Sequence, residues 1–241
     1  MKLFGLIGSK LQHSFSKLYF DKKFKELKEE LKFELFPLEN IELFRDLLKS
    51  KPELKGLAVT IPYKIEVIKY LDELDISAKE TGAVNCIKIA EKTTGFNTDI
   101  LGFEKSFLSL PVHKKSCLVL GDGGASRAVK YILSRHSIKF LQVSRKPSLD
   151  AIFYNQITEK IISEYSVIIN CTSLGMFPNV QFKPDIPYQY LSPKNILFDL
   201  VYNPEKTSFL IEGEKKGAII KNGLEMLHIQ AEENWRIWNE D

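Results

Sequence analysis

Two short stretches of the chain combine residue types that could do chemistry. LAVTIPYK, residues 57–64, ends an apolar run with a hydroxyl at Thr60 and an ammonium at Lys64. GDGGASRA, residues 121–128, follows the apolar run SCLVL and opens directly into a helix-like segment. Glycines allow a tight turn and a close approach of backbone N–H groups to a pyrophosphate, which then lies at the positive end of the helix. The second stretch therefore indicates a dinucleotide site.

The spacing of this turn is not a full GxGxxG, because Ser126 stands at the third glycine position. A glycine turn alone is also compatible with a plain connection between a strand and a helix. The buried strand before it and the helix after it favour the dinucleotide interpretation.

The next strand indicates which dinucleotide binds. It ends in VSRK, with Ser144, Arg145 and Lys146, and carries no Asp or Glu to bond the ribose 2′-hydroxyl of NAD. A guanidinium binds a phosphate with a planar fork, whereas a carboxylate would repel it. The pattern favours NADP over NAD. The alternative is that Arg145 and Lys146 belong to a solvated loop.

Alternating strand and helix patterns predict two α/β units that position these stretches. In the first, we expect strands at KLFGLIG, FELFPL and GLAVTI, a helix from Lys17 to Leu31, and a helix that starts at Pro62. In the second, KFLQVSRK, SVIINCT and NILFDLVY read as buried strands of a parallel sheet. The predicted domains are residues 1–100 and residues 101–223, followed by a long amphipathic helix at 224–241.

Composition excludes several other classes of protein. Hydrophobic residues make up 44% and charged residues 27% of the 241, which is typical of a soluble globular chain. A net charge of +3 predicts neither nucleic-acid nor membrane binding. The cysteines are far apart and odd in number, which indicates reduced thiols, and the apolar N-terminal run is too short for a signal peptide. We expect a cytoplasmic protein without a metal site, since the histidines form no ligand-like group.

The motifs, taken together, resemble the shikimate dehydrogenase family from the first strand to the last helix. Eight blocks appear in the family's order: HSFS (13–16), VTIPYK (59–64), GAVNC (82–86), FNTD (96–99), GDGGASRA (121–128), NCTSLGM (170–176), YNPEKTSFL (202–210) and NGLEMLHIQA (222–231). The resemblance implies NADP-dependent, reversible reduction of 3-dehydroshikimate to shikimate. It also implies an α/β substrate domain, a Rossmann-type doubly wound parallel-sheet domain for NADP, and a C-terminal helix that returns to the first domain.

The resemblance assigns the substrate contacts. Ser14 and Ser16 would bind the substrate carboxylate, with Tyr202 as a further donor. The ring hydroxyls would be contacted by Thr60, Asn85 and Gln230. Each has a plainer interpretation: Ser16 as a helix N-cap, Asn85 as a turn residue and Gln230 as a polar position on the last helix.

Lys64 and Asp99 resemble the family's catalytic pair. When a hydride reaches the carbonyl carbon, the oxygen becomes negatively charged and needs a proton. An adjacent ammonium can supply that proton or stabilise the negative charge. The sequence leaves both roles open for Lys64. Asp99 would orient the lysine and hold the adjacent hydroxyl. The plainer interpretations are a solvated lysine and an aspartate N-cap.

The cofactor contacts implied by the resemblance are the glycine turn for pyrophosphate, VSRK for the adenosine phosphate, NCT for ribose and three later residues for the nicotinamide. They are Gly121, Gly123, Gly124, Ala125, Ser126, Ser144, Arg145, Lys146, Asn170, Cys171, Thr172, Val201, Gly223 and Met226. Met226 is equally compatible with an ordinary core methionine.

Several positions depart from the family pattern without removing a catalytic group. Asp122 brings a carboxylate into the phosphate turn, and a second arginine for the 2′-phosphate is not evident in KPSLD, residues 146–150. The remaining departures are Lys17, Ala58, Cys86 and Ile100.

Two alternatives stay open at this point. One is an NAD(P)-dependent quinate/shikimate dehydrogenase, against which the absence of an acid after KFLQVS argues. The other is a non-catalytic shikimate-binding regulator, which need not keep both Lys64 and Asp99. The family contains monomers and homodimers, and the sequence favours neither.

Overall fold

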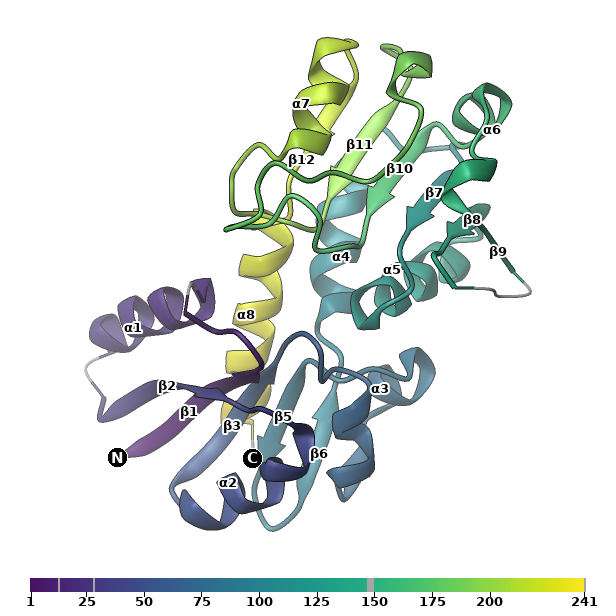
Figure 1. Cartoon of the computed structure of the whole chain (residues 1–241). Helices are drawn as coiled ribbons and strands as arrows, with labels where there is room; N and C mark the ends of the chain where they lie inside the picture. The colour runs from purple at the N-terminus through teal and green to yellow at the C-terminus, as the bar shows by residue number, and fades with distance from the viewer. Residues whose placement is uncertain (13, 28, 147–149, 241) are drawn as a thin grey trace. The chain divides into compact units, whose positions relative to one another are not determined.

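The computed structural model describes residues 1–12, 14–27, 29–146 and 150–240, and it divides into two α/β units (Figure 1). The first unit holds Met1–Thr98 and Gln230–Asp241, and the second holds Asp99–Ile229. Helix α8 (Leu224–Asn239) is shared, because its first turns belong to the second unit and the rest to the first.

The first unit is built on a mixed sheet with strand order β2-β1-β3-β5-β6-β4. Strand β1 is parallel to β2 and β3, whereas β5 is antiparallel to β3 and β6. The strands are β1 (Lys2–Gly8), β2 (Leu31–Pro37), β3 (Leu54–Val59), β4 (Glu73–Leu74), β5 (Cys86–Ile89) and β6 (Thr93–Phe96). The helices before residue 98 are α1 (Phe15–Leu27), α2 (Phe44–Ser50), α3 (Ile76–Thr81) and the 3-10 helices η1 (Ile41–Leu43) and η2 (Glu66–Tyr70).

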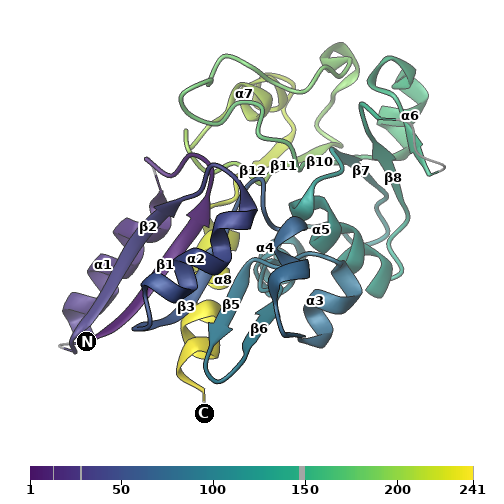
Figure 2. The same ribbon diagram turned by 60° about the horizontal axis from the view of Figure 1, so that its bottom comes forward.

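Side chains alternate across this sheet and feed two cores, as the period of a strand requires. Phe4 and Leu6 of β1 face a cluster that includes Phe20 of α1 and Trp238 of α8. Leu3 and Ile7 face the other cluster, which includes Phe44 of α2. In Figure 2, α1 and α8 accordingly lie on the opposite side of the strands from α2.

Trp238 explains why the end of α8 packs on this sheet. Its ring stacks on Phe4 with centroids 5.1 Å apart, and its Nε1–H donates to the Ile87 carbonyl at 3.0 Å. Gly56 of β3 leaves room for the indole, since a Cβ there would lie 2.3 Å from Trp238 Cδ1. A close approach of this kind requires glycine.

The second unit is a parallel sheet with strand order β12-β11-β10-β7-β8-β9. This is a doubly wound order whose direction reverses between β7 and β10. The strands are β7 (Cys117–Leu120), β8 (Phe140–Val143), β9 (Ala151–Ile152), β10 (Val167–Asn170), β11 (Ile196–Asp199) and β12 (Ile219–Lys221). The helices are α4 (Asp99–Leu108), α5 (Gly124–Arg135), α6 (Glu159–Glu164), α7 (Ser208–Lys215) and the 3-10 helices η3 (Tyr154–Gln156) and η4 (Tyr188–Tyr190), followed by α8.

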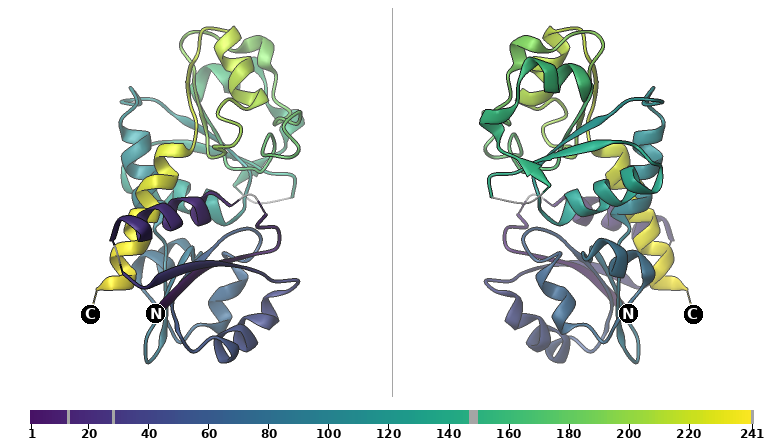
Figure 3. Two further views of the ribbon diagram at one scale, coloured as in Figure 1. Left: turned by 90° about the vertical axis from the view of Figure 1, so that its left-hand side faces the viewer. Right: turned by 90° about the vertical axis from the view of Figure 1, so that its right-hand side faces the viewer.

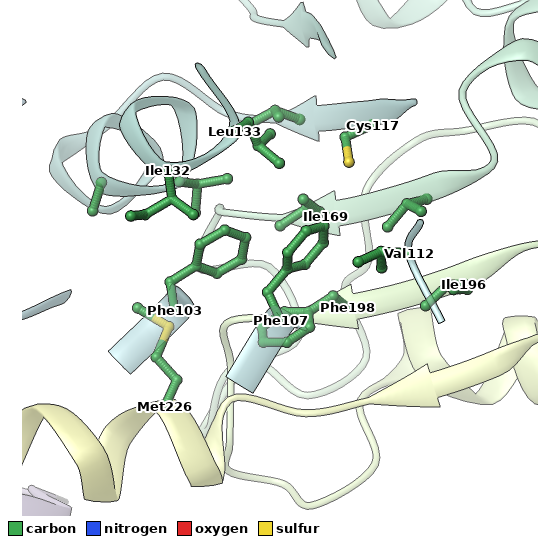
Figure 4. Packing of buried hydrophobic residues seen from close by; sticks show 14 of the residues in the cluster. Phe103, Phe107, Val112, Cys117, Ile132, Leu133, Ile169, Ile196, Phe198 and Met226 are labelled. Atoms are coloured by element: carbon green, nitrogen blue, oxygen red, sulfur yellow. The ribbon is translucent and has the colours of Figure 1, made fainter. Parts of the chain in front are cut away.

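Both faces of this sheet are covered, which is why its strands are apolar throughout. One core joins the sheet to α4, α5 and the start of α8, and the other joins it to α6 and α7 (Figure 3). Figure 4 shows the first core, where Phe103 and Phe107 of α4 stack with centroids 4.9 Å apart and Phe198 lies against them. Ser106 of α4 donates to the Glu225 carboxylate of α8 at 2.9 Å.

The predicted fold class is confirmed, including the parallel second sheet and the C-terminal helix that returns to the first unit. Two predicted helices are wrong in detail. The first spans Phe15–Leu27, because Leu31 instead pairs with Lys2 in the sheet. No α-helix starts at Pro62: the chain turns, the Lys64 carbonyl accepts the Val84 N–H at 2.7 Å, and a 3-10 helix follows at Glu66. Within the described ranges, no helix is long and apolar enough to cross a bilayer.

Candidate active site

Thr60 and Lys64 follow the carboxyl end of β3, and backbone hydrogen bonds hold this segment beside Asn85. The Val59 N–H donates to the Asn85 carbonyl at 2.8 Å, and the Val84 N–H donates to the Lys64 carbonyl at 2.7 Å. Tyr63, between them, is buried and donates its hydroxyl to the Leu38 carbonyl at 2.7 Å. The structure therefore brings the segment that carries Thr60 and Lys64 together with Asn85.

The loop after β1 lies against the same segment. The Ser9 N–H donates to the Ile61 carbonyl at 3.3 Å, and a Cβ at Gly8 would lie 2.6 Å from Thr60 Cγ2. Ser14 stands in front of α1, and Ser16 lies in its first turn, since the helix begins at Phe15. Ser16 is therefore not the N-cap that one interpretation assigned to it. His13 of the HSFS block lies outside the described residues.

A buried amide network surrounds Asn85, whose side chain is 2% exposed. Asn85 Oδ1 accepts the Thr98 N–H at 2.7 Å, and its Nδ2 donates to Thr98 Oγ1 at 2.9 Å and to Gln230 Oε1 at 3.4 Å. Asn234, one turn beyond Gln230 on α8, accepts the Thr98 hydroxyl at 2.6 Å. The network fixes the amide of Asn85 relative to Gln230.

Asp99 is 5% exposed and is the first residue of α4. It is covalently next to Thr98, whose backbone and hydroxyl are held by Asn85 and Asn234. Asp99 and the half-buried Tyr202 belong to the second unit. Their expected pairing with Lys64 and with the two serines stays a prediction.

The glycine turn connects β7 to α5 in the second unit. Gly121 has a φ of +101°, which disfavours any side chain, and Gly123 precedes the first residue of the helix, Gly124. A Cβ at Gly123 would meet nothing within 4 Å, so the turn is open above the N-terminus of α5. Ser126, which stands at the third glycine position, is buried, and its hydroxyl donates to the Gly123 carbonyl at 2.8 Å. The buried hydroxyl at this position therefore has a hydrogen-bond partner within the turn.

The predicted ribose segment lies next to this turn. The Cys171 N–H donates to the Leu120 carbonyl at 2.9 Å, and Thr172 Cγ2 would lie 2.9 Å from a Cβ at Gly121. The two loops leave the carboxyl ends of β7 and β10, between which the strand order reverses. Ligands of doubly wound sheets bind at this point. Burial raises the pKa of the Cys171 thiol, so this cysteine is not a reactive thiolate.

The strand end after β8 carries an exposed cation and a neutral hydroxyl. Ser144 is buried; it donates to the Asp122 carboxylate at 3.1 Å and accepts the Lys146 N–H at 3.0 Å. The hydrogen bond from Ser144 holds the Asp122 carboxylate toward β8, so the turn can accommodate a carboxylate at this position. Arg145 and Lys146 are exposed. Residues 147–149, most of KPSLD, lie outside the described part of the chain.

The three predicted nicotinamide residues lie around the end of β11. A Cβ at Gly223 would lie 2.2 Å from the Leu200 carbonyl oxygen, and the Gly223 N–H donates to the Val201 carbonyl at 3.2 Å. Met226 is 6% exposed and packs in the core beside Phe103 (Figure 4). Val201 and Gly223 are therefore neighbours, and Met226 is largely a core residue.

Residues missed at the sequence level complete both groups. Asn234 and Thr98 support Asn85 in the first unit, and Asp199 with Thr207 supports Asn170 in the second. Asp199 could have been noticed, because an acid at the end of the buried run NILFD is unusual. Over the part of the chain that the structure describes, no group of three or more His, Cys, Asp or Glu residues could hold a metal ion.

The fold and the open glycine turn define a two-unit α/β protein whose second unit has the architecture of dinucleotide-binding dehydrogenases. Residues 6–87 match the family model of the shikimate dehydrogenase substrate binding domain. A shikimate dehydrogenase (NADP(+)) of Methanococcus aeolicus is 36% identical over 98% of this chain and 91% of that protein.

Solved structures give the same result. A shikimate dehydrogenase from Aquifex aeolicus superposes with a TM-score of 0.89 and 33% identity, over 99% of this chain and 92% of that one. A shikimate 5-dehydrogenase from Thermus thermophilus, in complex with NADP(H) and shikimate, has a TM-score of 0.86 and 28% identity over 99% and 94%. The chain belongs to the shikimate dehydrogenase family.

Proposed function

We propose that the protein catalyses the reversible, NADP-dependent reduction of 3-dehydroshikimate to shikimate, a step toward chorismate and the aromatic amino acids. The observation that carries this function is the similarity to a shikimate dehydrogenase (NADP(+)) over 98% of the chain. The match includes both the segment of Thr60 and Lys64 and the glycine turn. A fold by itself would not carry a reaction, so the residues of the site must supply the remaining argument.

The first unit supplies the substrate contacts. Its candidates are short hydroxyl and amide side chains, which suit a small ring that bears hydroxyls and a carboxylate. Asn85 and Gln230 are held in a buried network, so their amides are pre-organised before a substrate arrives. Ser14 and Ser16 would bind the carboxylate, with Tyr202 of the second unit as a further donor.

Lys64 and Asp99 would manage the proton. The Lys64 ammonium would stand at the carbonyl oxygen of the substrate, where it stabilises the negative charge that develops there and provides a proton. If Lys64 transfers the proton, the same nitrogen would take it from the hydroxyl in the oxidation of shikimate. Asp99 would orient the ammonium. Whether Lys64 transfers the proton or only stabilises charge is decided by the pH dependence of its variants.

The second unit fits NADP. Its turn is open above Gly123, its α5 N-terminus presents backbone N–H groups, and Arg145 is exposed after β8 in the segment Ser144–Lys146, which itself contains no acid. Bound NADP supplies the hydride chemistry. The residues that would hold it are the turn from Gly121 to Ser126, the segment Ser144–Lys146, the segment Asn170–Thr172, and Val201, Gly223 and Met226.

We also propose a cytoplasmic enzyme that acts as a monomer or a homodimer on a small-molecule substrate, with residues 1–100 and the C-terminal helix as the substrate domain. Sedimentation at micromolar concentration distinguishes the two oligomeric states.

Purified protein should be mixed with shikimate, and the absorbance of reduced nicotinamide followed with NADP and with NAD in parallel. Fast reduction of NADP, with NAD much slower, supports the proposal. Preferred turnover with NAD, or activity on quinate, would instead favour a quinate/shikimate dehydrogenase. Shikimate binding without turnover with either cofactor would make the protein a regulator and refute the enzymatic function.

A further inference from the structure

Asp199 is a fully buried carboxyl group at the end of β11 that the proposed reaction does not use. Its Oδ1 accepts Nδ2–H of Asn170 at 2.9 Å and the N–H of Val201 at 3.0 Å. Its Oδ2 accepts the hydroxyl of Thr207 at 2.5 Å. Burial of a carboxyl group destabilises the folded state unless its oxygens are hydrogen-bonded. Both oxygens of Asp199 have such partners.

The three donors are neutral, and burial raises the pKa of Asp199 to about 7. Both protonation states fit the same geometry, because the Thr207 hydroxyl can rotate. It donates to Oδ2 of the carboxylate and would accept the proton of the acid. The hydrogen-bond framework therefore does not depend on the charge.

This framework reaches the glycine turn through Asn170. Oδ1 of Asn170 accepts both the N–H and the hydroxyl of Thr172, at 3.0 Å and 2.7 Å. Thr172 in turn lies against Gly121, where a Cβ would be 2.9 Å from its Cγ2. Asp199 is thus joined to the turn through two intervening side chains, those of Asn170 and Thr172, and to Val201 directly.

We propose that Asp199 is a positioning residue of the cofactor site. Its carboxyl group holds the loop after β11 at Val201 and, through the Asn170 amide, sets where Thr172 stands beside the glycine turn. The inference rests on the proposed function, because it takes Asn170–Thr172 and Val201 to be cofactor contacts.

A role in folding alone would look different. Thr207 caps α7 by accepting the Leu210 N–H, so a variant of Asp199 could loosen that helix without affecting NADP. Asn195 provides a matched control. It is 3% exposed, it precedes the amino end of the same strand, and its side chain accepts the Ser192 N–H at 2.9 Å. Loss of its hydrogen bonds should destabilise the unit away from the turn.

The experiment compares Asp199→Ala, Asp199→Asn and Asn195→Ala by fluorescence titration with NADPH, by steady-state kinetics and by thermal unfolding. For Asp199→Ala we expect Kd for NADPH to rise about tenfold, because buried donors lose their acceptor, with KM for shikimate unchanged. Asp199→Asn should restore binding to within about threefold, since its carbonyl can accept from Asn170 and Val201 and its amide can donate to Thr207. Asn195→Ala should lower Tm and leave Kd for NADPH unchanged.

Three outcomes would overturn the inference. They are an unchanged Kd in Asp199→Ala, an equal rise in KM for shikimate, and an Asn variant as impaired as the Ala variant. If Asp199→Ala does not fold, Thr207→Val against Thr207→Ser carries the test, because only serine keeps the hydroxyl. Kd for NADPH should then be several-fold higher in the valine variant, and equal values would refute the proposal. Wild-type protein that binds no NADPH would refute the proposed function itself.

Discussion

The Thr98 hydroxyl donates a 2.6 Å hydrogen bond to Oδ1 of Asn234 and joins the segment before α4 to the C-terminal helix. Both residues are almost fully buried. The backbone and hydroxyl of Thr98 also hydrogen-bond to both ends of the Asn85 amide. The contact between Asn234 of α8 and Thr98 therefore helps to position Asn85, a residue predicted to contact the substrate.

Asn234→Ala should therefore affect both stability and substrate binding. The Thr98 hydroxyl and Gln230 lose a buried partner, and we expect the free energy of unfolding to fall by about 1–3 kcal/mol. KM for shikimate should rise, while Kd for NADPH stays the same. Asn239→Ala, at an exposed position of the same helix, is the control and should change neither. An Asn234 variant that loses stability with KM unchanged would limit Asn234 to a role in folding.

Lys64→Met keeps most of the side-chain shape and removes the ammonium. Loss of a group that assists proton transfer should lower kcat by about a hundred- to ten-thousand-fold, while binding of shikimate is kept. Lys69→Ala is the matched control, since Lys69 is an exposed lysine on the 3-10 helix that follows. Equal activity of the two variants in the absorbance assay would remove Lys64 from the mechanism.

Arg145→Ala tests the preference for NADP. Without the guanidinium, KM for NADP should rise about tenfold or more, and KM for NAD should not change, because only NADP carries the 2′-phosphate. Lys160→Ala, an exposed cation on α6, should leave both values unchanged. A parallel rise for both cofactors would show that Arg145 contributes to general binding and not to the choice of cofactor.

Gly123→Ala should separate binding from stability. Its backbone, at φ −82°, accepts a side chain and its Cβ would meet nothing within 4 Å, so Tm should hardly change. The methyl group would fill the space in which a pyrophosphate approaches the backbone, so Kd for NADPH should rise. Gly121→Ala, at φ +101° and against Thr172, should lower Tm as well. Unimpaired NADPH binding by Gly123→Ala would argue against this turn as the phosphate site.

Asp199 makes the stability of the protein depend on pH. Burial raises its pKa to about 7 from about 3.9 in an unfolded chain, so the native state binds the proton more tightly. Its contribution is fully present below about pH 4 and is lost as the pH rises to about 7, by at most about 4 kcal/mol. Asp199→Asn is neutral throughout. The urea midpoint of the wild type should therefore fall relative to that of Asp199→Asn between about pH 5 and about pH 8, and parallel curves would contradict the shift.

The sequence predicted the elements whose signal is local. Apolar runs located the strands around SCLVL and SVIIN, and the glycine turn located the start of α5, because periodicity and turn chemistry act over a few residues. The end of the first helix was wrong, since pairing of Leu31 with Lys2 overrides a helix-favouring local composition. The α-helix expected at Pro62 does not form, because Tyr63 and Lys64 instead hydrogen-bond to backbone groups that are distant in sequence.

The candidate site divides in the same way. Motif residues such as Thr60 and Gly121 could be named from their neighbours in sequence. Asn234 could not, because it is defined by a partner, Thr98, that only the folded chain brings near. Asp199 stands out as an acid at the end of the buried run NILFD, but its partner Asn170 is known only from the folded chain. An Asn on α8 and an Asp at a strand end carry no local mark of the hydrogen bonds that they accept.

The division of α8 between the two units also affects the order in which their cores can be completed as the chain is synthesised. The second unit is complete at residue 229, whereas the core of the first lacks Ala231, Ile237 and Trp238 until the ribosome has passed them. Until α8 packs on the sheet, Phe4 and the space at Gly56 that the Trp238 indole fills are therefore uncovered. Strand β1 is synthesised first, but its apolar face is among the last surfaces of the first unit to be buried. A chaperone would meet this face during translation.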